Sequence, residues 1–191
     1  MLSKATPERM SLFSDGVFAV LITVLVLELH PPEAATYAAL LTLWPHWLSY
    51  AVSYLFIAIV WINHHYLLRY AQEATPRLLW LNFAHLFSIS LLPQSTEWMA
   101  TSGLKPQPVS FYAVVFFLVN ATHVALIREL IGANHDAPSE VRRAMRRRSW
   151  TTLVLFGTAT IVALWSGLAG FGICLACLAL YLRPHPLRAA G

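Results

Sequence analysis

Charged residues are scarce in this chain of 191 residues: 12% are Asp, Glu, Lys or Arg, whereas a soluble domain has about 25%. Apolar residues make up 58% of the chain, and its mean hydropathy is +0.59. This balance excludes an ordinary soluble domain and indicates an integral membrane protein. The apolar runs are much longer than the alternating strands of a membrane β-barrel, so the predicted fold class is all-α.

Cysteine is also rare, since Cys174 and Cys177 are the only two in the sequence. Their C-x-x-C spacing is typical of redox or metal sites, but no second pair and no soluble strand–helix pattern accompany them. We interpret them as small packing residues on one helix face. A small-residue cleavage site is missing as well, so we expect the first apolar run to remain as the first helix.

What the sequence does contain is a series of long apolar segments. The first four are long enough for membrane-spanning helices, which need roughly 17–25 residues. The last two are short and indicate a tight hairpin around Ser166 and Gly167, while Pro93 should kink or end the third helix. We predict a single domain, residues 1–191, with transmembrane helices at residues 10–29, 41–67, 78–100, 109–131, 150–166 and 169–183.

The basic residues predict the orientation of these helices. Every lysine and arginine except Lys105 falls on one side of the predicted membrane, and the positive-inside rule makes that side the cytoplasm. Both termini are then cytoplasmic, in the cell membrane. The net charge of +4 therefore indicates topology rather than a nucleic-acid partner. Residues 132–149 form a basic cytoplasmic loop, in which a capped helix from Ser139 should touch anionic membrane lipids.

The first predicted helix has two different faces. Val20, Thr23, Val24 and Leu27 follow an i, i+3, i+4, i+7 pattern and share one side. Asp15 lies five residues before Val20 and therefore points about 140° away from this stripe. One face is thus aliphatic with a single hydroxyl, and the other carries a carboxylate into the protein.

A lone carboxylate at membrane depth costs several kcal/mol unless it is paired, so Asp15 needs partners. The candidates all fall near the predicted cytoplasmic ends of their helices. They form a predicted inner polar network of Arg9, Ser14, Asp15, Asn63, His64, His65, Asn82 and His85. Two interpretations stay open: polar bonds that join neighbouring helices, and a proton relay or ligand site. Asn120 and His123 are expected to make ordinary core hydrogen bonds.

One segment resembles a known family. The pattern R-x-x-x-F-S-D-G-V-F-A-V, from Arg9 to Val20, is similar to the signature of the transmembrane protein 175 family. The W-x-N-H-H segment that begins at Trp61 and the L-L-P run that ends at Pro93 are also similar. The resemblance implies a potassium-permeable channel, a homotetramer of six-helix subunits whose first helix lines a central pore.

By position after F-S-D, the resemblance implies a pore constriction at Val20, Val24 and Leu27. Thr23 would supply a hydroxyl layer where K⁺ binds transiently, without a fixed metal site or a cofactor. Since the chain has no T-V-G-Y-G-like segment, no filter of backbone carbonyls is expected. An aliphatic ring would gate by dewetting, and it would favour K⁺ over Na⁺ because K⁺ loses water more readily.

Two other kinds of protein remain as alternatives. Histidines on several helices permit a haem-binding redox protein, although His123 is expected near mid-span and the others near the inner edge. Asp15 with the histidines would also suit a proton-coupled transporter of small solutes. Enzyme chemistry is not predicted, because no nucleophile–base pair, phosphate loop or metal cluster stands out.

Overall fold

The computed structural model describes residues 6–132 and 139–181; of residues 132, 139–142, 144–146, 180 and 181 it describes only the backbone. All the regular elements of this part are helices, which confirms the predicted all-α class. They are α1 Pro7–Leu27, α2 Tyr37–Thr42, α3 Trp44–Leu68, α4 Pro76–Ser90, α5 Leu92–Thr101, α6 Pro106–Gly132, α7 Ser139–Ala163 and α8 Gly167–Tyr181.

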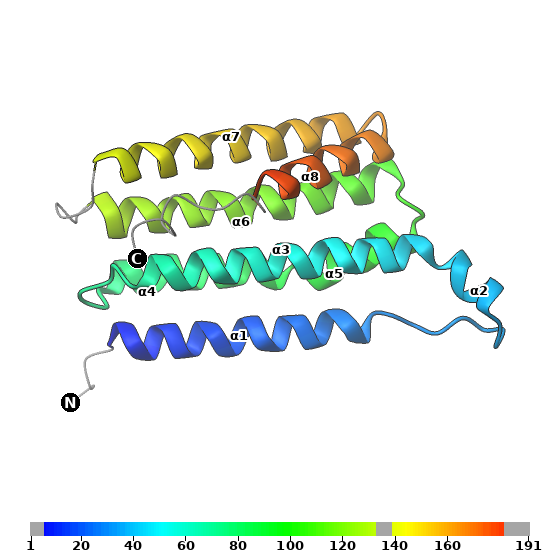
Figure 1. Ribbon diagram of the computed structural model, residues 1–191, viewed down its shortest axis with the longest axis horizontal. Helices are drawn as coiled ribbons and strands as arrows, with labels where there is room; N and C mark the ends of the chain where they lie inside the picture. Colours follow the sequence, from blue (N-terminus) through cyan, green and yellow to red (C-terminus); the bar gives the residue numbers. More distant parts are fainter. Residues whose placement is uncertain (1–5, 133–138, 182–191) are drawn as a thin grey trace.

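The long helices lie side by side along one axis (Figure 1). α1 follows one edge of the bundle and α7 the opposite edge, with α3, the α4–α5 pair and α6 between them. α8 lies against α7 and α6. The connection between α3 and α4 lies at the end where α1 begins, and the short α2 lies at the other end.

Proline determines where most of these helices begin. Pro7, Pro76 and Pro106 are the first residues of α1, α4 and α6, a position where the missing N–H would have no partner anyway. The side chains of Thr6 and Thr75 cap the first two of these helices by accepting from backbone N–H groups. These local signals fix the helix starts close to the predicted ones.

Proline also divides two of the predicted spans. The expected helix 41–67 is interrupted at Leu43, between α2 and α3, and Pro45 is the second residue of α3. The expected helix 78–100 is interrupted at Leu91, and Pro93 is the second residue of α5. A proline ring clashes with the carbonyl four residues earlier, so the preceding helix cannot run through it. The predicted effect of Pro93 is confirmed, whereas that of Pro45 was not foreseen.

The predicted basic loop 132–149 differs most from the structure. Residues 133–138 lie outside the described part, but from Ser139 the chain is helical and continues into the fifth apolar segment as α7. The basic segment is therefore the first part of a long helix and not a separate one. The final predicted span is α8, and its last two expected residues, 182 and 183, lie outside the described part.

The hairpin between α7 and α8 is tight, as predicted. A Cβ atom on Gly170 would collide with Ala163 in α7, and one on Gly167 would collide with the backbone carbonyl of Leu104. Glycine is required at both positions because the neighbouring backbone approaches too closely for a side chain. The absence of side chains here brings α8 close to α7 and to the start of α6.

The core is aromatic and aliphatic. Phe116 stacks on Phe56 with ring centroids 3.8 Å apart, and Phe156 packs against both rings. Cys174 and Cys177 are fully buried in this core and are not disulfide-bonded, which confirms the packing interpretation. The C-x-x-C spacing therefore places two small apolar side chains on the core face of α8.

A short chain of hydroxyl groups crosses the same core. Thr96 donates to the backbone carbonyl of Leu92 at 2.7 Å, so its oxygen accepts from Ser53 at 2.7 Å. Ser53 in turn accepts from Tyr112 at 2.8 Å. Each hydroxyl has one hydrogen, so this order satisfies all three. These hydrogen bonds join α3 and α6 to α5, the helix that follows α4 after the break at Leu91.

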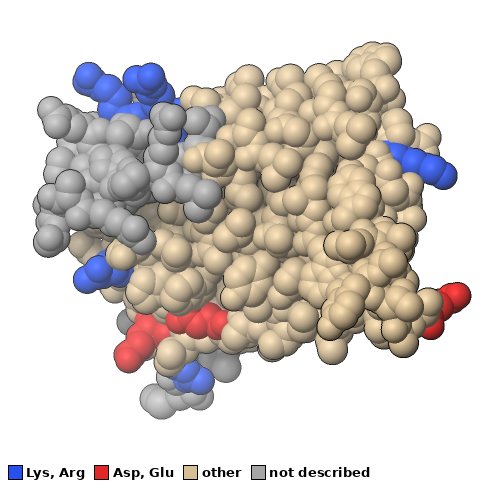
Figure 2. Space-filling view, turned by 45° about the vertical axis from the view of Figure 1, so that its right-hand side comes forward, with Lys and Arg blue, Asp and Glu red and all other residues tan. Residues whose placement is uncertain are grey.

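Three helices of the described part are long and apolar enough to cross a membrane: α1, α3 and α6. Exposed tryptophans also lie near both ends of the bundle, with Trp80 at one end and Trp44, Trp98 and Trp165 at the other, while the exposed Trp150 lies about midway along α7. Figure 2 shows one face on which charged side chains lie toward the two ends and the middle is uncharged. Such aromatic belts around an uncharged band are typical of proteins that span a membrane.

Candidate functional site

The two sides of α1 differ in the way that the sequence predicts. Five residues of α1 are buried against the rest of the bundle: Met10, Ser14, Phe18, Leu21 and Leu25. On the other side, Val20 is 58% exposed and Leu27 74% exposed. Thr23 is also exposed, and Val24 is half-buried at the margin of this stripe. The predicted constriction residues thus lie on or beside a face that no other part of the described chain covers.

Thr23 has a specific orientation on this face. Its hydroxyl donates to the backbone carbonyl of Val20 at 2.7 Å. Because a hydroxyl has one hydrogen and two lone pairs, the oxygen still has an acceptor site for a cation or a water molecule. The position can therefore offer a weak oxygen ligand on an otherwise aliphatic face.

The packed side of α1 carries the centre of the predicted polar network. Asn82 of α4 donates its amide to the Ser14 hydroxyl at 3.0 Å, and Ser14 donates to its own helix at the Met10 carbonyl, 2.9 Å away. The amide oxygen of Asn82 lies 2.8 Å from Nε2 of His64 in α3. Since that oxygen is an acceptor, the network assigns the hydrogen of His64 to Nε2. Three helices are joined by these bonds, and all three side chains are buried.

A column of imidazole rings continues from this centre. The rings of His64 and His85 are stacked with centroids 5.4 Å apart and planes 10° apart. His85 in turn lies 5.5 Å from the ring of His123 and hydrogen-bonds through Nδ1 to the Thr122 hydroxyl at 3.0 Å. The column thus runs from α3 through α4 to α6.

The expectation that His123 lies at a different depth from the other histidines is wrong. His85 lies nine residues after the start of α4 at Pro76, and His123 lies nine residues before the end of α6 at Gly132. Because the two positions are equally far from the same end of the bundle, the rings meet. The depth argument against a haem protein is therefore lost. Within the described residues, no group of three or more His, Cys, Asp or Glu side chains could hold a non-haem metal ion.

Asp15 makes a separate contact with α3. Its Oδ1 accepts a hydrogen bond from the indole Nε1 of Trp61 at 2.8 Å, and the side chain is half-buried. Trp61 was not among the predicted site residues, although an indole N–H is a donor that a carboxylate can use. Asp15 thus lies beside the Ser14–Asn82–His64 centre rather than within it.

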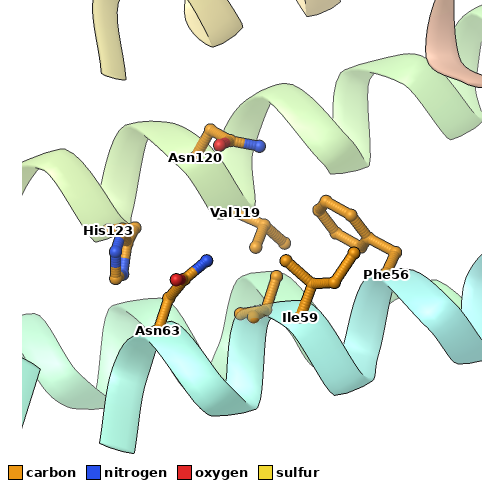
Figure 3. A pocket seen from close by; sticks show the side chains of 7 residues that line it. Phe56, Ile59, Asn63, Val119, Asn120 and His123 are labelled. Atoms are coloured by element: carbon orange, nitrogen blue, oxygen red, sulfur yellow. The ribbon is translucent and has the colours of Figure 1, made fainter. Parts of the chain in front are cut away.

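The remaining predicted residues lie apart from this centre. Arg9 is exposed near the start of α1, and His65 is exposed with its ring 5.8 Å from that of Trp61. Asn63 lines a small pocket between α3 and α6 with room for about one water molecule. Figure 3 shows Asn63 and His123 at one end of this pocket and Phe56 at the other.

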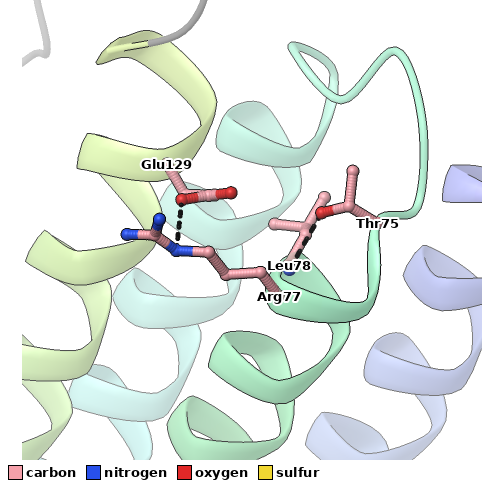
Figure 4. A network of polar contacts seen from close by, with 4 residues as sticks. All are labelled: Thr75, Arg77, Leu78 and Glu129. Carbon is pink, nitrogen blue, oxygen red and sulfur yellow. Dashed lines mark hydrogen bonds and ion pairs between the residues drawn. The ribbon is translucent and has the colours of Figure 1, made fainter.

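An ion pair lies near the same end of the bundle. Nε of Arg77 in α4 is 3.0 Å from the Glu129 carboxylate in α6 (Figure 4). Figure 4 also shows the cap of α4, where the Thr75 hydroxyl accepts from the backbone N–H of Leu78. Exposed ion pairs contribute about 0–1 kcal/mol, so this one adds little to stability but engages the acidic group of Glu129.

These features define a multi-pass helical membrane protein whose first helix has one packed side, with polar bonds in its first half, and one bare aliphatic side. Comparison with known proteins gives the same class more specifically. A family model described as the endosomal/lysosomal potassium channel TMEM175 matches residues 9–93, which include the F-S-D, W-x-N-H-H and L-L-P segments.

A potassium channel of Chryseobacterium sp. (strain P1-3) is 40% identical over 143 residues, 75% of this chain and 74% of the relative. The endosomal/lysosomal proton channel TMEM175 of Homo sapiens is 28% identical over 137 residues, 62% of this chain and 27% of the relative. The crystal structure of a lysosomal potassium-selective channel TMEM175 homolog from Chamaesiphon minutus is similar, with a TM-score of 0.82 and 25% identity over 97% of this chain and 98% of that one. This chain belongs to the TMEM175 family.

Proposed function

We propose that this protein is a subunit of a potassium-permeable channel in which α1 lines the pore. The bacterial relatives that match it are named potassium channels. The observation that carries the proposal is the bare stripe on α1, where Val20 and Leu27 are 58% and 74% exposed while the opposite side is packed. A homotetramer in the cell membrane, with α1 of each subunit facing a common axis, would cover this stripe and enclose a pore.

The proposed topology has six membrane crossings. α1, α3 and α6 are long and apolar enough on their own. The α4–α5 pair, the apolar part of α7 and α8 would make the other three. With the basic residues on the inner side, both termini would be cytoplasmic, and Lys105 would face outward in the connection before α6.

The proposed constriction is a set of aliphatic rings. Val20 and Leu27 are the more exposed members of the stripe and Val24 the less exposed, which favours the first two as the narrow layers. Such rings exclude water when narrow, and when wider they admit ions with part of the hydration shell removed. The acceptor site on Thr23 would assist a cation at the layer between them.

The inner polar network is proposed as an anchor for α1 rather than as part of the ion path. Ser14 and Asp15 bond to α4 and α3 respectively, on the side away from the bare stripe. Polar bonds between membrane helices fix their relative rotation, because a different rotation would leave polar groups unpaired. The rotation of α1 then determines which residues face the pore.

Ion flux from proteoliposomes tests the proposal. Protein reconstituted with potassium inside should pass K⁺ faster than Na⁺ and exclude N-methylglucamine. Val20→Trp should abolish most of the K⁺ flux by filling the pore. Val154→Trp is the matched control, because Val154 on α7 is similarly exposed, at 63%, but lies at the opposite edge of the bundle. Equal flux in the two variants would contradict a pore along α1.

A further inference from the structure

The exposed side of α7 changes its chemistry in steps along the helix. Its exposed residues recur at intervals of three, four and seven, so they share one face. Among the described side chains of α7, the exposed ones are Arg143, Arg147, Trp150, Thr151, Val154, Thr158 and Ile161, and Trp165 follows just after the helix ends. The order is cationic, then aromatic, then aliphatic with two threonines, and aromatic again just beyond the end of the helix. Such an order follows the depth profile of a lipid bilayer from one headgroup region to the other.

An arginine from the neighbouring helix joins the cationic end of this face. The guanidinium carbon of Arg128 in α6 lies 5.8 Å from the centre of the Trp150 ring. Both side chains are exposed. A guanidinium held against an aromatic ring keeps N–H donors for other partners, and its planar fork matches the oxygens of a phosphate. Arg128 and Arg147 thus flank Trp150 in the half of the bundle where α7 begins.

The nearest acidic side chain in α6 is already engaged. Glu129 follows Arg128 directly, but its carboxylate is bound by Arg77 of α4. Figure 2 shows basic side chains toward the end of the molecule where α7 begins. Within the described residues, no acidic side chain forms an ion pair with Arg128 or Arg147, so their positive charge can serve an anion from outside the chain.

We propose that Arg128, Arg147 and Trp150 form a binding site for the headgroup of an anionic phospholipid in the inner leaflet. The phosphate would lie against the two guanidinium groups, with Trp150 at the level of the glycerol backbone. One acyl chain would follow Val154 and Ile161. Seven residues separate Arg147 from Val154, about 10 Å along the helix, which is the separation needed between a headgroup and the upper part of its acyl chain.

A lipid suits this face better than a second protein chain. α7 lies at the edge opposite α1 (Figure 1), and a subunit that turns α1 toward a common axis would turn α7 toward the lipid. A protein partner would also need acidic groups opposite the arginines. Anionic lipids supply such groups through their headgroups. The preference for a lipid over a protein partner rests on the proposed orientation of α1, but lipid binding is measured without ion flux, so the two proposals fail separately.

Native mass spectrometry of the purified protein tests the site. The probes are dioleoylphosphatidylglycerol, dioleoylphosphatidylcholine and glycerol 3-phosphate. The phosphatidylglycerol should bind at least fivefold more tightly than the phosphatidylcholine, and glycerol 3-phosphate should not compete at equal concentration. Each basic residue near an anionic headgroup contributes about fivefold in affinity, so Arg147→Gln should lose about fivefold and Arg128→Gln with Arg147→Gln about 30-fold.

Arg69→Gln is the matched control, because Arg69 is an exposed arginine directly after α3, near the same end of the bundle. It removes the same charge and should change phosphatidylglycerol affinity by less than twofold. Equal losses in Arg69→Gln and Arg147→Gln would indicate diffuse attraction and overturn the site. Equal binding of the two lipids by the unmodified protein would also overturn the site, and this measurement does not depend on a variant that folds. Tight binding of glycerol 3-phosphate alone would identify a site for soluble phosphates instead.

Discussion

The hydrogen bond between Asp15 and Trp61 allows the anchoring of α1 to be measured. Asp15→Ala removes the acceptor, and Trp61→Phe removes the indole N–H while keeping an aromatic ring. If the two groups act only through each other, either change should destabilise the subunit, and the second change should add little to the first.

The size of this effect follows from the chemistry of the bond. The donor–acceptor distance of 2.8 Å is that of a good charge-assisted hydrogen bond, for which net contributions of about 1.5–3 kcal/mol are typical. Polar bonds between membrane helices give less, about 0.6 kcal/mol on average, and the half-buried carboxylate regains some hydration when Trp61 is lost. We therefore expect a coupling energy of about 1 kcal/mol.

The assay is a double-mutant cycle on the free energy of unfolding in mixed micelles, followed by helical circular dichroism with increasing denaturing detergent. Asp15→Asn is the control, because asparagine keeps an acceptor oxygen and should retain part of the coupling. Ion selectivity of folded Asp15→Ala should be unchanged, since Asp15 points about 140° away from Val20.

Two results would refute this reasoning. Additive free energies for Asp15→Ala and Trp61→Phe would show that the bond does not couple the helices. Normal stability of Asp15→Ala together with a changed K⁺/Na⁺ flux ratio would place Asp15 in the ion path and not in an anchor.

Two further predictions concern the bare stripe of α1. Thr23→Val removes the acceptor oxygen at nearly constant volume and should change the K⁺/Na⁺ flux ratio about two- to fivefold, the equivalent of one weak polar contact. Thr23→Ser keeps the hydroxyl and should keep the ratio. An unchanged ratio in Thr23→Val would remove the hydroxyl from the mechanism. Leu27→Ala should raise K⁺ flux at little cost in stability because Leu27 is 74% exposed in the subunit. Leu25→Ala, at a position 1% exposed, should instead cost about 2–5 kcal/mol, and melting curves with flux assays on both variants would expose a reversed assignment of the two faces.

The division of α1 into two faces could be predicted from the sequence because the helical period determines which residues share a side, and the need of Asp15 for partners indicated which face would be packed. Val20 and Leu27 are seven residues apart and both are exposed. Val24 lies about 40° from Val20, which accounts for its place at the margin of the stripe.

The polar network was predictable only as a set of residues at similar depth. Which of them meet depends on which helices are neighbours and how each is rotated, and a single sequence does not contain that information. His64 and His65 differ by about 100° around α3, so only one can face Asn82, and the structure selects His64. The same lack of neighbour information left out Trp61 as the partner of Asp15.

Helix boundaries show a similar division between local and global information. The break before α3 has a local cause, since Pro45 cannot be preceded by a continuous helix, and an apolar segment count overlooks it. The union of the basic segment with the fifth span in α7 has no such local marker, because a change from charged to apolar residues does not end a helix.

The polar and apolar contacts of α1 are distributed unequally along its length, and this bears on how the proposed pore could widen. In the described chain, the side-chain hydrogen bonds from α1 to other helices come from Ser14 and Asp15, in its first half. From Phe18 to Leu25 the packed side is apolar. Hydrogen bonds fix distance and direction, whereas apolar contacts tolerate small rotations and shifts with little loss of buried area. The half that carries the proposed constriction is therefore held less rigidly than the half that anchors it, so a change in pore width should arise from tilting of the outer half of α1 about its fixed inner half.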